Sequence, residues 1–111
     1  MIKLENIKGM LIDLEGVLYN GDNIIEGAID SINKVKSSNI QIRYLTNTTT
    51  TTKDHILKKL NNLNIPAKTN EIFSPIIAAN NYLNKLKISK IFLMTQEILK
   101  KDFNNFILDD E

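Results

Sequence analysis

Apolar residues form three short runs, at 8–14, 40–46 and 90–95, and polar segments separate them. The first run, KGMLIDL, carries apolar residues on both faces of an extended chain. Such runs are typical of strands in a parallel sheet, where helices cover each face. The pattern therefore predicts three strands, and it predicts that the first of them is buried on both faces.

Between these strands, apolar residues recur at the spacing of amphipathic helices. The first helix ends near Ser37. The second begins where Thr51 and Asp54 fit a capping box, and the third begins at Ser74, with Pro75 in the first helical position. The apolar stripes consist of Ile25, Ala28, Ile29 and Ile32, then Ile56, Leu57, Leu60 and Leu63, and last Ile76, Ala79, Leu83 and Leu86.

The elements follow one another in the order β-α-β-α-α-β, with a short helix at 96–101 after the last strand. This order predicts an α/β fold, with a Rossmann-like parallel sheet of three main strands and helices on both faces. The chain of 111 residues has the length of one domain. We therefore interpret 1–111 as a single domain.

The composition narrows the range of functions. A formal net charge of +1 predicts no attraction to nucleic acid or to a membrane. The chain has no Cys, so disulfides and thiolate metal sites are ruled out, as is common in a reducing compartment. It also has no apolar run of membrane-spanning length and no signal-peptide core. The sequence indicates a soluble, cytoplasmic protein.

Polar residues follow the first two predicted strands. Asp13 and Glu15 end the first strand, with Gly16 behind them, and Thr46, Asn47 and Thr48 end the second. Ligands of open parallel sheets bind beyond the carboxyl ends of the strands.

Asp13 and Glu15 stand two residues apart, so in an extended chain both can face one pocket. Two carboxylates this close repel each other unless a cation lies beside them, and hard oxygen ligands suit Mg²⁺. Hydroxyl and backbone N–H groups at Thr46 and Asn47 suit an anionic phosphate.

These segments resemble a known family. LIDLEGVLYNG, at 11–21, is similar to the first motif of the haloacid dehalogenase superfamily of phosphohydrolases, and YLTNTT, at 44–49, is similar to its second. With EIFSPIIAA downstream, they resemble subclass IIA, whose members carry a C2-type cap and include the phospholysine phosphohistidine inorganic pyrophosphate phosphatase group. The resemblance extends to about Lys101.

The resemblance implies a role for each residue. Asp13 would be the nucleophile that forms an aspartyl-phosphate, and Glu15 would be the general acid and base. The Asp13 carboxylate and the Glu15 carbonyl would hold Mg²⁺. Thr46 and Asn47 would bind the phosphoryl group, with Gly16 and Thr48 also contacting phosphate, and Gly16 would let the chain turn beside the nucleophile. Thr48 would line the pocket, and the substrate would be a small phosphorylated metabolite.

The sequence departs from the family in two ways. Glu15 stands where the superfamily usually has Asp, and one methylene moves the carboxyl by about 1 Å, which can cost about a hundredfold in rate. This departure bears on acid/base efficiency rather than on the fold. The superfamily also uses a Lys after its third motif and a later acidic pair, and we find neither here. Asp109 and Asp110 follow the third strand too closely to be that pair, so we interpret them as a solvated chain end.

The resemblance therefore implies a partial core that ends about where the cap begins. Within the superfamily the first strand is central, so three strands alone leave one of its edges exposed and open to pairing. This leaves open self-association, or a complementary chain, through the edge of strand one.

Other readings remain open. The chain is a phosphohydrolase in part, or else a non-catalytic remnant that binds phosphate or a protein partner. A receiver-type signalling domain fits less well, because its acceptor Asp follows the third strand. Tyr19 and Asn20 belong either to a flap over the substrate or to an ordinary loop. We expect His55 to lie on the solvated surface, and Lys100 and Lys101 to form a charged helix end.

Overall fold

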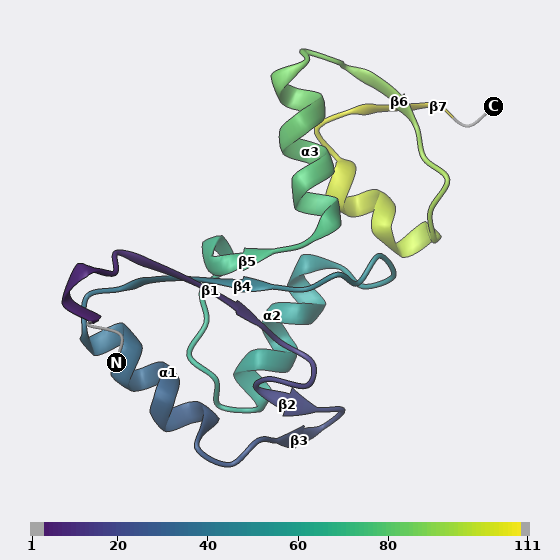
Figure 1. Ribbon diagram of the computed structural model, residues 1–111. Coiled ribbons are helices and arrows are strands. Elements are labelled where there is room, and N and C mark those ends of the chain that lie inside the picture. The colour runs from purple at the N-terminus through teal and green to yellow at the C-terminus, as the bar shows by residue number, and fades with distance from the viewer. Residues whose placement is uncertain (1–3, 110–111) are drawn as a thin grey trace.

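The computed structural model describes residues 4–109. Its main sheet has three parallel strands in the order β1 (Gly9–Asp13), β4 (Gln41–Leu45) and β5 (Ile72–Phe73) (Figure 1). Helix α1 (Ala28–Ser37) connects β1 to β4, and α2 (Lys53–Asn62) connects β4 to β5. The α/β class with a parallel sheet is thus confirmed.

Short elements complete this part of the chain. A hairpin of β2 (Tyr19–Asn20) and β3 (Asn23–Ile24) follows β1. The 3-10 turn η1 (Leu4–Asn6) precedes β1, and the 3-10 turn η2 (Thr69–Glu71) leads into β5. The hairpin turn contains Gly21, whose φ of 58° is a conformation that glycine adopts readily.

Capping residues set the helix starts. Thr52 caps α2, because its hydroxyl accepts a hydrogen bond from the His55 N–H at 3.2 Å, so the helix begins one residue later than the predicted capping box. Ser74 caps α3 (Pro75–Lys85) as predicted, and its Oγ accepts from the Ile77 N–H at 3.4 Å.

Only one face of the sheet is covered within the described residues. Ile42 and Tyr44 of β4 are buried and face α1 and α2, which lie on the same side of the sheet in Figure 1. The opposite face of β1 is open, and Leu11 there is 68 % exposed. The prediction that the first strand is buried on both faces is therefore wrong for this part of the chain, because the described residues place no helix on the second face.

The core beneath the sheet is fixed by two polar contacts. The Tyr44 side chain is fully buried, and its hydroxyl donates to the Pro66 carbonyl at 2.6 Å. Lys36 of α1 forms an ion pair with Glu71, with 2.7 Å between Nζ and Oε2. These contacts join β4 and α1 to the segment that leads into β5.

The third predicted strand lies elsewhere. Residues 90–95 yield only β6 (Lys90–Phe92), which pairs in parallel with β7 (Ile107–Asp109) in a separate sheet. The third strand of the main sheet is β5, whose two residues are too few to produce an apolar run in the sequence. Asp109 lies within β7 with its carboxylate 3.1 Å from the Lys90 Nζ, rather than in a solvated end, and Asp110 lies outside the described residues.

The β6–β7 sheet lies with a second hydrophobic cluster, separate from the core beneath the main sheet. The 3-10 segment η3 (Glu97–Phe103) packs Leu99 and Phe103 against Ile76 of α3 and Phe106. Figure 1 shows this unit beside the main sheet, and the molecule measures 53 × 32 × 19 Å. The radius of gyration of the molecule is 16.3 Å, whereas a compact domain of this length has a radius of gyration of about 13 Å. The two clusters explain this elongation.

Candidate functional site

The carboxyl ends of β1 and β4 meet at one edge of the sheet. Asp13 ends β1 and lies opposite Leu45, the last residue of β4, so Thr46 and Asn47 follow directly beside it. A cavity of about 450 Å³ opens at this edge, and we call it the strand-end cavity. It is lined by Asp13, Leu45, Thr46, Asn47, Phe73, Ser74 and Pro75.

A second cavity, of about 390 Å³, is lined in part by the same loop. We call it the flap cavity, because the β2–β3 hairpin contributes Tyr19 to its wall. It is lined by Leu14, Glu15, Tyr19, Thr46, Asn47, Thr48, Thr51, His55, Ile56 and Lys59. Thr46 and Asn47 line both cavities. Asp13 shares the strand-end cavity with them, and Glu15 shares the flap cavity with them.

The turn after β1 fixes the two acids. Leu14, between them, is buried in the core, so Asp13 and Glu15 are directed away from it. The Leu14 N–H donates to Asp13 Oδ1 at 2.8 Å, and the Gly21 N–H donates to Glu15 Oε1 at 2.9 Å. Glu15 is therefore held against the hairpin, while Asp13 is held at the strand end.

Gly16 makes this turn possible. Its φ is 81°, a left-handed conformation that costs other residues energy, and its N–H donates to the Tyr19 carbonyl at 2.7 Å. Gly16 lines neither cavity, although we predicted that it contacts phosphate. In the structure its part is to bring Tyr19 of the hairpin back toward Glu15.

The pKa of Tyr19 depends on its burial and on the charges near the flap cavity. Burial raises the pKa of its hydroxyl, and the charges of Glu15 and then Asp13 raise this pKa further. The Nζ of Lys59 lies 4.6 Å from the centre of the Tyr19 ring, within the range of a cation–π contact. The hairpin residue that the sequence left undecided thus forms part of the site.

The loop after β4 presents its polar groups to both cavities. The Thr46 N–H donates to the Phe73 carbonyl at 3.1 Å, which ties the loop to β5. The Thr48 N–H donates to the Thr46 hydroxyl at 3.3 Å. Asn47 is exposed, and none of the described residues accepts a hydrogen bond from its backbone N–H. This N–H is free to donate to an anion.

The donor set suits a hard divalent cation. The described residues contain no cluster of three or more His, Cys, Asp and Glu side chains that could hold a metal. Asp13 supplies a carboxylate at the end of β1, and two residues later the Glu15 carbonyl accepts no hydrogen bond from another described residue. One or two carboxylates, with water and a substrate phosphate, are the usual ligands of Mg²⁺ in phosphoryl-transfer sites. The residues present therefore fit the predicted metal.

Sequence reasoning missed part of the flap cavity. His55, which is exposed as predicted, and Lys59 both line it. Thr51, His55 and Lys59 are spaced four residues apart, so they share one side of the α2 region. This spacing was the available signal, and it lies beside the apolar stripe of α2, whose Ile56 lines the same cavity.

Comparisons with known proteins agree with this arrangement. The haloacid dehalogenase-like hydrolase family matches residues 10–107. An acid sugar phosphatase of Staphylococcus haemolyticus is 37% identical over 84 residues, which cover 76% of this chain and 32% of that protein. The human haloacid dehalogenase-like hydrolase domain-containing protein 2 is 29% identical over 94% of this chain and 40% of its own length.

Solved structures show the same fold. A thermostable NPPase of Geobacillus stearothermophilus is 28% identical with a TM-score of 0.74, over 93% of this chain and 41% of that one. A p-nitrophenyl phosphatase of Archaeoglobus fulgidus has a TM-score of 0.85 at 21% identity, over 94% and 41% of the two chains. The chain thus spans about a third to two fifths of the length of these relatives. On the family match and the shared fold, the chain belongs to the haloacid dehalogenase-like hydrolases.

Proposed function

We propose that this chain carries the nucleophile and the phosphate-binding loop of a Mg²⁺-dependent phosphohydrolase. The observation that supports this most is the position of Asp13 at the end of β1, where it lines the strand-end cavity with Thr46 and Asn47. The relatives named as phosphatases point in the same direction. The substrate would be a small phosphorylated metabolite bound between these residues.

The reaction would proceed in two steps. A carboxylate oxygen of Asp13 attacks phosphorus, and the bond from phosphorus to the leaving oxygen breaks while Glu15 gives that oxygen a proton. Glu15 then takes a proton from water, which attacks the aspartyl-phosphate and releases inorganic phosphate. The Thr46 hydroxyl and the Asn47 N–H stabilise the charge on the phosphoryl oxygens, and Thr48 shapes the loop that presents them.

Glu15 needs to reach the leaving oxygen to do this. In the structure its Oε1 accepts from the Gly21 N–H of the hairpin, so movement of the hairpin would carry the carboxyl with it. The Asp13 carboxylate and the Glu15 carbonyl would hold Mg²⁺, which would supply positive charge against the phosphate and so favour attack by an anionic carboxylate.

One edge of the main sheet is open to a partner. Strand β1 is at the edge of the described sheet, and Leu11 beside that edge is 68 % exposed. We propose that a second copy or a complementary chain pairs there.

That residues 1–111 form one partial core domain ending near a cap stays a prediction. Within residues 4–109, no helix is long and apolar enough to cross a membrane. A cytoplasmic location is part of the proposal.

A second candidate is a non-catalytic, phosphate-binding half of such an enzyme, because the chain spans only 32% to 41% of the relatives compared. Hydrolysis of p-nitrophenyl phosphate with Mg²⁺ separates the two candidates. Turnover that Asp13→Asn abolishes supports a self-sufficient enzyme. Release no faster than that of Asp13→Asn contradicts self-sufficiency and favours the phosphate-binding half.

A further inference from the structure

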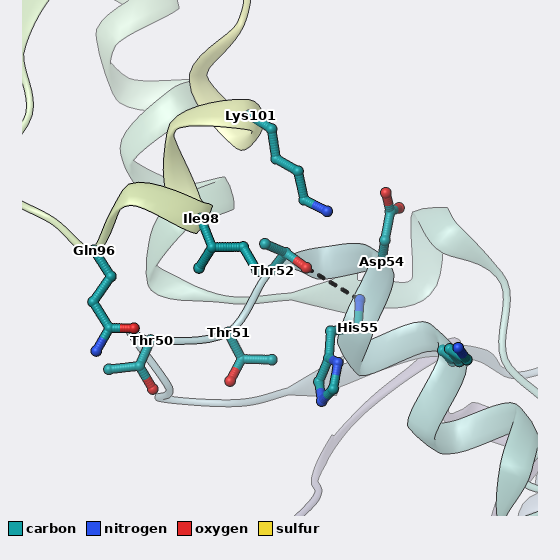
Figure 2. Close-up of a pocket in the computed structure, with 9 residues that line it drawn as sticks. Thr50, Thr51, Thr52, Asp54, His55, Gln96, Ile98 and Lys101 are labelled. Carbon is teal, nitrogen blue, oxygen red and sulfur yellow. Dashed lines mark hydrogen bonds between the residues drawn. The ribbon is translucent and has the colours of Figure 1, made fainter.

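A third cavity, of about 460 Å³, lies between the start of α2 and the segment η3 (Figure 2). We call it the lysine cavity. It is lined by Thr50, Thr51, Thr52, Asp54, His55, Lys58, Gln96, Ile98 and Lys101. Apart from the apolar Ile98, every lining residue carries a hydroxyl, amide, imidazole or charged group, so this cavity suits a polar occupant rather than an apolar one.

The lysine cavity adjoins the flap cavity. Thr51 and His55 line both, so a molecule seated beside Glu15 and Thr46 can extend past these two side chains without leaving the surface of the protein. Figure 2 shows Thr51 and His55 on the α2 side of the lysine cavity, facing Gln96, which precedes η3, and Lys101 of η3. Asp13, Thr46 and Asn47, where the phosphoryl group would be held, do not line the lysine cavity. A molecule that extends into this cavity therefore extends away from the phosphoryl group.

The charges in the lysine cavity favour an anion. Lys58 and Lys101 contribute two positive charges, against one negative charge from Asp54. Neither lysine forms an ion pair with another residue of the part that the structure describes, although Asp54 and Lys58 are four residues apart on one helix. Both lysines are exposed, so they can bind an anion without first breaking a hydrogen bond or ion pair within residues 4–109.

The two walls of the cavity are held together. The Lys53 N–H at the start of α2 donates to Asp102 Oδ2 of η3 at 3.1 Å. The Asn80 side chain of α3 donates to the Asp102 carbonyl at 3.0 Å. The position of Lys101, the neighbour of Asp102, is therefore set relative to α2, and the gap between the two lysines is a feature of the fold.

We propose that the lysine cavity binds a second anionic group on the substrate's leaving portion. This inference rests on the proposed phosphohydrolase function. The substrate class is then a phosphomonoester with a further phosphate or carboxylate at its far end, such as a sugar bisphosphate. Thr51, His55 and Gln96 are placed to hydrogen-bond hydroxyls of the connecting part.

Binding to the full 111-residue chain tests this inference without requiring turnover. The probes are inorganic phosphate, glucose 6-phosphate and glucose 1,6-bisphosphate, each titrated in Mg²⁺ and followed by backbone amide NMR shifts. We expect the bisphosphate to bind about tenfold more tightly than the monophosphate, as for one or two added charge-assisted hydrogen bonds. The double variant Lys58→Ala/Lys101→Ala should lose that difference and keep its affinity for the monophosphate within about twofold. Lys34→Ala, which removes an exposed lysine of α1, is the matched control and should behave as wild type.

These outcomes distinguish a failure of the lysine cavity as a second site from a failure of the proposed phosphohydrolase function. If the Thr46 and Asn47 amides shift with phosphate but the double variant keeps the full preference for the bisphosphate, the lysine cavity is not the second site. If Lys34→Ala lowers the preference as much as the double variant does, the effect is general charge, and the inference fails as well. If the Thr46 and Asn47 amides respond to no probe, both the proposed function and this inference are overturned.

Discussion

Replacing Tyr44 with Phe tests how the strand that carries the phosphate-binding loop is held. Tyr44 lies in β4, two residues before Thr46, and is 0% exposed, with its hydroxyl 2.6 Å from the Pro66 carbonyl. Tyr44→Phe removes this hydrogen bond and leaves the carbonyl without its partner. We expect the free energy of unfolding at pH 8 to fall by about 1 to 2 kcal/mol.

The same side chain makes stability depend on pH. Burial, and then the charge of Glu71, raises the pKa of Tyr44 from 10.0 to about 12. The unfolded chain releases this proton near pH 10, whereas the folded chain keeps it until about pH 12. Between those values the folded state holds more protons, so stability falls as pH rises. The contribution is complete below pH 10 and falls by about 1.4 kcal/mol per pH unit, or about 2.7 kcal/mol across the window.

Urea unfolding of the wild type and Tyr44→Phe at intervals from pH 8 to pH 11.5 measures both effects. The difference between the two proteins removes the contribution of lysines, which titrate in the same range. We expect the wild type to be the more stable protein at pH 8 and to lose that advantage above pH 10.5. A difference that stays constant over the whole range would refute the assigned burial and hydrogen bond.

Three further substitutions test other parts of the account. Gly16→Ala meets no atom within 4 Å but must adopt a φ of 81°, so we expect a loss of about 1 to 2 kcal/mol in urea unfolding, and no loss would show that the turn relaxes. A double-mutant cycle of Lys36→Ala and Glu71→Gln should give a coupling energy of about 1 kcal/mol that weakens in high salt, whereas additive effects would mean that the ion pair is inert. Leu11→Lys should abolish concentration-dependent association in sedimentation velocity, and association unchanged by this charge would place the contact away from β1.

Much of the fold follows from local patterns. The Ser74-Pro75 pair predicted a helix start correctly, because a side-chain acceptor and a fixed φ act within one turn of the chain. The residues after β1 and β4 could be placed at one edge of the sheet, because parallel strands share their carboxyl ends.

Features that depend on tertiary context were not predictable in the same way. The sequence at 90–95 has the composition of a sheet strand, yet β6 pairs with β7, and a two-residue strand takes the third place in the main sheet. The apolar pattern of β1 gives no indication of which elements are present to cover it, so the exposure of Leu11 had to come from the structure. Lys101 was interpreted as a charged helix end, because the facing α2 lies more than forty residues earlier in the chain.

The central claim is that Asp13 receives a phosphoryl group while Thr46 and Asn47 bind its oxygens. Beryllium trifluoride tests it directly, because it is a tetrahedral phosphoryl mimic that bonds to a carboxylate in the presence of Mg²⁺ and needs no turnover. Added to the 111-residue chain, it should shift the amide signals of Leu14, Thr46 and Asn47. Asp13→Asn should abolish these shifts, and Asp22→Asn, an exposed acid in the hairpin turn, should leave them intact. Shifts that persist in Asp13→Asn, or that are absent from the wild type, would contradict the account.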